Sequence, residues 1–103
     1  MVYFDFDQYT VRDDARPTVE GNARWLNANK NAKVVLEGHT DEVGGREYNL
    51  ALGQKRAEAV RRSLSVLGVS DAQMEAVSFG EERPAVSGGG ENERNRRVEL
   101  KYR

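Results

Sequence analysis

Alternation of apolar and polar residues marks both ends of the sequence as β-strands. Residues 2–7 read V-Y-F-D-F-D, and residues 97–103 read R-V-E-L-K-Y-R. A period of two is typical of a strand with one buried face and one solvated face. It does not fit a sheet covered on both sides, whose strands read as nearly continuous apolar runs. We therefore expect a sheet with one open face.

Two segments with helical spacing lie between these ends. The first, residues 13–28, begins with two aspartates, which suit the free N–H groups and dipole of a helix N-terminus. Its apolar face holds Val19, Ala23 and Leu26. The second covers residues 46–67 and ends before Gly68, a typical C-terminal cap. The apolar stripe of this second helix is expected to consist of Leu52, Ala59, Val60, Leu64 and Leu67.

Two further strands complete the expected fold, at residues 33–39 and 75–79, with a short helical turn at 70–74. The predicted class is α/β (α+β), a two-layer sandwich in the order βαβαββ. It has a mixed sheet of about four strands, with two main helices on one face. One domain spans residues 1–103, as the length suggests. The glycine-rich stretch 87–90 is expected to be a flexible connection.

Composition narrows the possible functions. The net charge is −1, from 16 basic and 17 acidic residues, which argues against electrostatic binding of nucleic acid or anionic membranes. No apolar stretch approaches the roughly 20 residues that a membrane helix needs, and no signal peptide is visible. The absence of cysteine removes disulfides, thiol catalysis and thiolate metal sites. We predict no cofactor and no metal.

One cation stands on the apolar side of the second helix. Arg56 lies four residues after Leu52 and four before Val60, and Asn49 is on the same side. A core-facing guanidinium needs an anionic or carbonyl partner, because an unpaired buried charge is costly. Carboxylates in the loop before the helix, chiefly Asp41 and Glu42, are the expected partners. This loop lies at the rim of the sheet, where α/β domains commonly bind ligands.

Two interpretations of Asp41 and Arg56 are compatible with this spacing. In the first, they form a structural ion pair that orients the loop. In the second, they flank a pocket for a zwitterion, with Arg56 binding a carboxylate and Asp41 an ammonium group. Both can hold if the ion pair opens onto a ligand. Tyr48, near the start of the helix, has two possible roles: it flanks such a pocket, or it has only a packing role.

Other chemical signals are weaker. His39 and Asp41 have the spacing of a metal motif, but the sequence has no second histidine. Asp5 and Asp7 could serve as an acid/base pair, yet they are expected to face solvent or to pair with Arg97 and Lys101. No serine has a convincing base beside it, and the basic residues near the C-terminus are spread over an exposed strand. The prediction is that the protein is not an enzyme.

Five motifs, in order along nearly the whole chain, resemble one family. They are V-Y-F-D-F-D (2–7), E-G-H-T-D-E (37–42), E-Y-N-L-A-L-G-Q-K-R-A (47–57), S-F-G-E-E-R-P (78–84) and N-R-R-V (95–98). The sequence resembles the OmpA-like peptidoglycan-binding domain. It is most similar to the branch of that family formed by the peptidoglycan-associated lipoproteins (Pal) of Gram-negative bacteria.

This resemblance implies non-covalent binding of peptidoglycan through the meso-diaminopimelate of the stem peptide. The family's key aspartate matches Asp41 and its key arginine matches Arg56. The further expected ligand-binding residues are Thr40, Asn49, Leu52, Phe6 and Asp7. The implied setting is the Tol-Pal system, in which the lipoprotein links the outer membrane to the wall from its periplasmic side. The implied partners are the stem peptide and a TolB-like periplasmic protein.

The sequence departs from the lipoprotein pattern in three places. Val43 stands where an arginine is usual, and this change is expected to alter partner binding more than ligand binding. The segment 85–94 is short and rich in glycine. The lipidated N-terminal cysteine is absent, so we expect the chain to be the folded domain of a longer, membrane-anchored protein. A stator subunit, a porin's C-terminal domain or a protein-interaction module without a wall ligand remain the alternatives.

Overall fold

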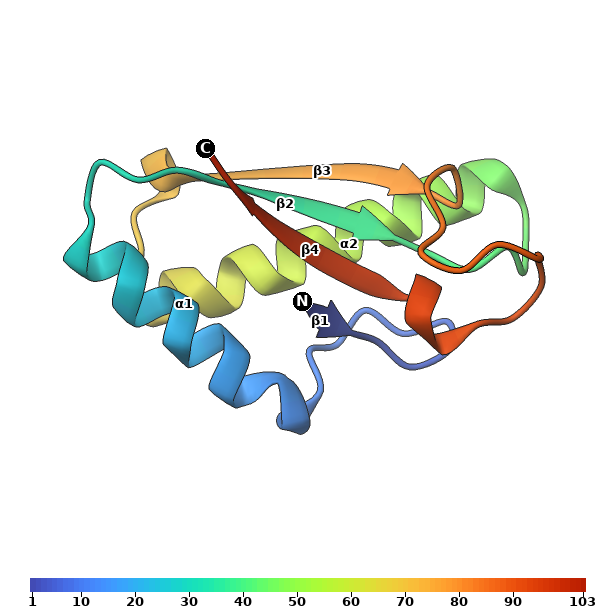
Figure 1. Cartoon of the computed structure of the whole chain (residues 1–103), viewed down its shortest axis with the longest axis horizontal. Helices are drawn as coiled ribbons and strands as arrows, with labels where there is room; N and C mark the ends of the chain where they lie inside the picture. Colours follow the sequence, from blue (N-terminus) through green and yellow to red (C-terminus); the bar gives the residue numbers. More distant parts are fainter.

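A four-stranded mixed sheet organises the protein, and the computed structural model describes residues 1–103. The strands are β1 (Val2–Tyr3), β2 (Val34–His39), β3 (Met74–Gly80) and β4 (Arg97–Tyr102). Their spatial order is β1-β4-β2-β3, with β2 parallel to β3 and antiparallel to β4. β1 pairs antiparallel with β4 at the edge of the sheet (Figure 1).

Two helices cover one face of this sheet. They are α1 (Arg16–Ala28) and α2 (Arg46–Val66). Short 3₁₀ turns are η1 (Asp13–Ala15), η2 (Asp71–Gln73) and η3 (Glu93–Asn95). The predicted fold class is confirmed, with α2 lying along the sheet and α1 angled beside it (Figure 1). None of the helices combines the length and apolar character required to cross a membrane.

The hydrophobic core fills the space between the sheet and both helices. Its 14 buried residues are Val2, Phe4, Ala15, Val19, Ala23, Leu26, Val34, Leu36, Ala57, Val60, Leu64, Val69, Met74 and Val98. The strand residues among them alternate with residues on the opposite, open face, as the period of two predicts. Removing a large side chain from such a core typically costs about 2–5 kcal/mol.

The closest approach between helix and sheet occurs at two glycines. A Cβ atom on Gly38 of β2 would lie 1.8 Å from the carbonyl oxygen of Gly53 on α2. Only glycine at position 38 therefore allows α2 to cross β2 at this distance. Three residues after this crossing, α2 presents Arg56 to the interior.

The apolar stripe of α2 differs from the prediction at two positions. Ala59 is only half-buried and Leu67 is 41% exposed. Gly53 and Ala57 are buried instead, because the close helix–sheet contact turns the small residues of α2 toward β2. The helix ends as predicted, with Gly68 at a φ of +97°, a conformation that glycine adopts readily.

The first strand is much shorter than predicted. Regular pairing ends at Tyr3, and one further hydrogen bond runs from the Phe4 N–H to the Arg96 carbonyl. The chain then turns, with the Gln8 N–H donating to the Asp5 carbonyl and with Asp7 at a φ of +55°. The prediction of a strand over residues 2–7 is therefore wrong in its second half. This part forms a loop instead.

Candidate ligand-binding site

A cavity of about 220 Å³ opens at the C-terminal end of β2, where three segments converge. These are the loop after β1, the loop after β2 and the first turns of α2. The lining residues are Phe6, Asp7, Asp41, Val43, Gly44, Tyr48, Asn49, Leu52 and Arg56. Six of the seven residues named from the sequence thus line one cavity, although they come from segments distant in the sequence.

Thr40 is the residue that does not line the cavity. It is buried, its hydroxyl donates to the Asp41 carbonyl at 2.8 Å, and its N–H donates to the Gly80 carbonyl at 2.9 Å. The second bond extends the contact between the ends of β2 and β3. Thr40 therefore shapes the backbone that carries Asp41.

Arg56 is fully buried and binds backbone carbonyl groups. Its Nε donates to the Gln8 carbonyl at 2.7 Å, Nη1 to the His39 carbonyl at 3.0 Å and Nη2 to the Asp5 carbonyl at 3.2 Å. The expected ion pair with Asp41 is wrong, since the carbonyls of the turn after β1 take these donors. Burial lowers the pKa of Arg56 to about 10, partly offset by the negative charge of Asp41. The guanidinium is still protonated at pH 7.

Asp41 forms its ion pair with Arg96 instead. Arg96 Nη1 lies 3.2 Å from Asp41 Oδ2, and the Val43 N–H donates to Asp41 Oδ1 at 3.2 Å. Both side chains of the pair are almost buried. The sequence reasoning missed Arg96 as a site residue, although it belongs to the N-R-R-V motif that supported the family resemblance.

Asn49 fixes the loop that follows β2. Its side-chain amide donates to the Val43 carbonyl at 3.1 Å and to the Glu81 carboxylate at 3.1 Å. Asn49 is buried in the first turn of α2, seven residues and thus about two turns before Arg56 on the same side. Leu52 is 8% exposed and supplies an apolar wall between the two.

The rim of the cavity is partly aromatic. The Tyr48 hydroxyl donates to the Asp7 carboxylate, and this hydrogen bond raises the pKa of Tyr48. Tyr48 therefore flanks the cavity, one of the two alternatives left open by the sequence. Phe6 is 48% exposed and also lines the cavity, as does Val43 in the loop after β2.

The two aspartates after the first strand, Asp5 and Asp7, do not contact the last strand. Asp5 lies 3.5 Å from Arg12, and Asp7 binds Tyr48, so neither pairs with β4. Arg97 and Lys101 both contact Glu99 on their own strand. Both aspartates are exposed to solvent, which confirms one of the two expected alternatives, and the other alternative, pairing with Arg97 and Lys101, is wrong because the chain leaves the sheet after Phe4.

A larger cavity, of about 310 Å³, lies between η1, α1 and the end of α2. Its charged lining residues, which include Arg12 and Arg16, are partly or fully exposed to solvent. The smaller cavity is the better candidate for a specific site because Asp41 and Arg56 bring buried opposite charges to it.

Comparison with known proteins identifies the family. The OmpA family model matches residues 3–97, and the chain therefore belongs to the OmpA family. The peptidoglycan-associated lipoprotein of Pseudomonas putida is 52% identical over 101 residues, covering 96% of this chain and 60% of that protein. The lipoprotein of Pasteurella multocida is 48% identical over 103 residues, covering 98% of this chain and 69% of that protein. The chain thus spans about three-fifths to two-thirds of the length of these relatives.

Solved structures show the same fold. The peptidoglycan-associated lipoprotein of Burkholderia pseudomallei superposes with a TM-score of 0.95 at 53% identity, covering 99% of this chain and 88% of that one. The C-terminal domain of Helicobacter pylori MotB has a TM-score of 0.86 at 20% identity, covering 99% of this chain and 83% of that one. At 20% identity, the similarity to the MotB domain shows a shared fold alone.

Proposed function

We propose that this domain binds peptidoglycan non-covalently, by holding the zwitterionic end of meso-diaminopimelate in the stem peptide. The observation that carries the proposal is the convergence of buried Asp41 and buried Arg56 on one open cavity. A free amino-acid end has an ammonium and a carboxylate group close together, so it needs one partner of each sign at a short separation. The high identity to peptidoglycan-associated lipoproteins supports the same assignment.

Both charged groups retain hydrogen-bonding capacity for a ligand. A guanidinium has five N–H donors, and Arg56 uses three of them on backbone carbonyls. Two N–H groups are left for the ligand carboxylate. A carboxylate has about four acceptor positions, and Asp41 uses two of them, on Val43 and Arg96. The remaining positions accept the ligand ammonium.

The other residues give the ligand its surroundings. Leu52 and Phe6 contact its aliphatic chain, while Asn49 and Thr40 hold the loop that carries Asp41. Asp7 adds a second carboxylate at the rim. Each of these contacts acts on binding, and none provides a nucleophile with a base beside it, so the domain leaves the peptide bonds of its ligand intact.

In a full-length lipid-anchored protein, this binding would link the outer membrane to the cell wall from the periplasmic side. The proposal includes membership of the Tol-Pal system and contact with a TolB-like partner, as the resemblance of the sequence to these lipoproteins implies. Val43 lies at the cavity rim and is 38% exposed, so it would face ligand and partner alike.

Cosedimentation with purified diaminopimelate-type sacculi tests the proposal. The parent should pellet with the wall material, whereas Asp41→Asn should stay in the supernatant because it removes the charge while keeping the shape. Glu42→Gln, a neighbouring exposed acid, is the matched control and should pellet like the parent. Equal pelleting of Asp41→Asn and the parent contradicts the proposal. Mass spectrometry of muropeptides after long incubation should find no cleavage products.

A further inference from the structure

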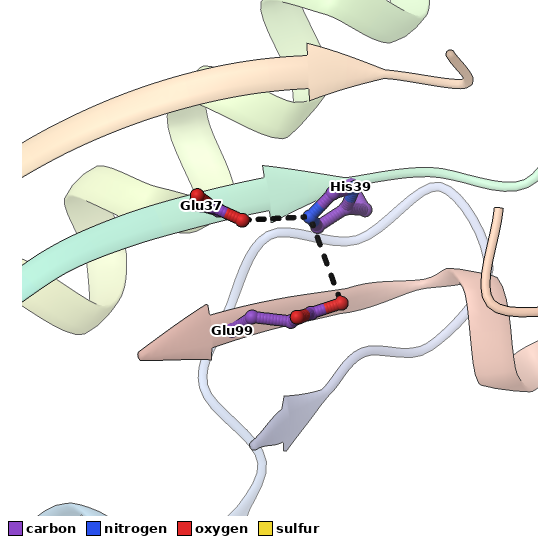
Figure 2. A group of neighbouring side chains, drawn as sticks. All are labelled: Glu37, His39 and Glu99. Carbon is purple, nitrogen blue, oxygen red and sulfur yellow. Dashed lines mark ion pairs between the residues drawn. The ribbon is translucent and has the colours of Figure 1, made fainter. Parts of the chain in front are cut away.

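A second cluster of polar side chains lies on the open face of the sheet, away from both helices. Glu37 and His39 project from β2 and Glu99 from β4, and their side chains point toward one another (Figure 2). His39 Nε2 lies 3.8 Å from Glu37 Oε1 and 3.9 Å from Glu99 Oε2. None of the three lines the cavity beside Asp41.

The two glutamates occupy an unfavourable position in the sheet. Glu37 and Glu99 are directly opposite each other in the antiparallel pairing of β2 and β4. Like charges at such positions destabilise a sheet. Glu99 is compensated by Arg97 at 2.6 Å and Lys101 at 3.0 Å, whereas Glu37 has no lysine or arginine within 4 Å. The Glu37 side chain is only 18% exposed, so its charge is poorly solvated.

His39 completes this cluster and is the most deeply buried of its three side chains. Its side chain is 2% exposed, and neither ring nitrogen has a hydrogen-bond partner. A neutral imidazole with a free nitrogen lone pair is the form that binds metal ions.

We propose that Glu37, His39 and Glu99 form a binding site for a divalent transition-metal ion of the Zn²⁺ type. One imidazole and two carboxylates are a donor set that zinc accepts, with a water molecule in the fourth position. Zinc ligand atoms lie about 2.0–2.2 Å from the ion, so two of them can be up to about 4.2 Å apart. The separations of 3.8 and 3.9 Å between the imidazole and each carboxylate meet this limit, and all three ligand atoms lie within 4.8 Å of one another. Mg²⁺ and Ca²⁺ prefer oxygen ligands alone.

The neighbouring cations have two effects on this site. The hydrogen bonds from Arg97 and Lys101 hold the Glu99 carboxylate in place, as partners of metal ligands commonly do. Their positive charges also repel the ion and weaken binding. Lys101 is 58% exposed, so its charge can be removed without disturbing the core. We therefore expect the Lys101→Gln variant to bind zinc more tightly than the parent protein.

A bound ion would join β2 to β4 just before the loop that carries Asp41. The His39 carbonyl already accepts a hydrogen bond from Arg56. The ion would thus stabilise the end of β2 on the side opposite to the cavity, without contacting a ligand there.

A zinc titration of untagged, chelator-treated protein tests the proposal. His39 is the only histidine and the chain has no cysteine, so its imidazole NMR signals report this site alone. The parent should bind one Zn²⁺ with a shift of these signals. Glu37→Gln should bind at least about tenfold more weakly, and Lys101→Gln more tightly. Glu58→Gln, an exposed acid on α2, is the control and should match the parent.

The proposal is overturned if the His39 signals of the parent stay unchanged up to millimolar Zn²⁺. It is also overturned if Glu37→Gln, shown by circular dichroism to be folded, binds zinc like the parent. The titration of the parent needs no variant, so it tests the proposal even if a substitution prevents folding. Neither depends on peptidoglycan binding, and the two proposals can therefore fail separately.

Discussion

Arg96 holds the carboxylate of Asp41, with Nη1 placed 3.2 Å from Oδ2 in an almost buried pair. The same guanidinium donates from Nε to the Phe4 carbonyl at 3.0 Å. It thereby ties the start of β4 to the chain leaving β1 and to the loop after β2. Asp41 is fixed in orientation before any ligand arrives, which reduces the ordering cost of binding.

Replacing Arg96 with lysine should weaken ligand binding while leaving the fold intact. A lysine keeps the charge but cannot bind both Asp41 and the Phe4 carbonyl with the fork of a guanidinium. The expected loss is about 1.5–3 kcal/mol of binding free energy, the range for a hydrogen bond to a charged group. Calorimetry with a diaminopimelate muropeptide measures it. Arg94→Lys, at an exposed position, should bind like the parent, and equal affinities for both variants would contradict the role given to Arg96.

Arg56→Ala should destabilise the fold as well as the site. It removes three hydrogen bonds that hold the turn after β1 and leaves a void in the interior. We expect the free energy of unfolding in urea to fall by about 3–5 kcal/mol. Arg62→Ala, on the exposed side of α2, should change it by no more than about 0.5 kcal/mol. Similar unfolding curves for the two variants would show that Arg56 does not support the loop.

Replacing two different glycines with alanine should change the free energy of unfolding in opposite directions. Gly38→Ala places a methyl group against the backbone of α2 at Gly53, and we expect destabilisation of about 3 kcal/mol or more. Gly21→Ala, inside α1, meets only the flexible end of Arg24 at 3.9 Å. Its better helix propensity should stabilise the protein by about 0.5–1 kcal/mol. Denaturant unfolding of both variants checks the signs, and a tolerated Gly38→Ala would contradict the close helix–sheet contact.

The buried imidazole of His39 should make stability depend on pH. In metal-free protein the unfolded chain takes up this proton near pH 6.5, but the folded chain does so only near pH 4. The free energy of unfolding should therefore fall as the pH drops from 6.5 to 4, by about 3 kcal/mol relative to His39→Gln. The charged groups around the imidazole are Glu37, Arg83, Arg97, Glu99 and Lys101.

NMR titration of the single histidine provides the direct check. If the two glutamates dominated, its pKa would lie above 6.5 and the slope of stability with pH would reverse in that range. A measured pKa near 4 agrees with burial and the charge of Arg97 as the main causes.

Local patterns predicted most of the fold. Alternation in 97–103 and the 3.6-residue period of α2 are set by which residues face the core, so the sequence carries them directly. The prediction of a strand over residues 2–7 was wrong in its second half because the Arg56 guanidinium binds the Asp5 and Gln8 carbonyls. That competition arises from a residue about fifty positions away, and no local pattern contains it.

The sequence predicted which residues form the candidate site better than it predicted which partners those residues contact. The position of Arg56 in an apolar stripe required a buried partner, and this reasoning was sound. The identity of that partner depends on tertiary geometry. Arg56 binds backbone carbonyl groups and not the carboxylate of Asp41. Arg96 was missed because the alternation of the last strand assigned the basic residues near the C-terminus to an exposed face, whereas Arg96 is only 9% exposed and pairs with Asp41.

Calorimetric titration with two stem peptides, one containing meso-diaminopimelate and one containing lysine, tests the central claim most directly. The two differ by the carboxylate assigned to Arg56, which lysine lacks. The account predicts clear binding of the diaminopimelate peptide and a loss of about 2–5 kcal/mol for the lysine peptide, the range for leaving one partner of a buried charge pair unmatched. Equal affinity for both peptides would contradict it.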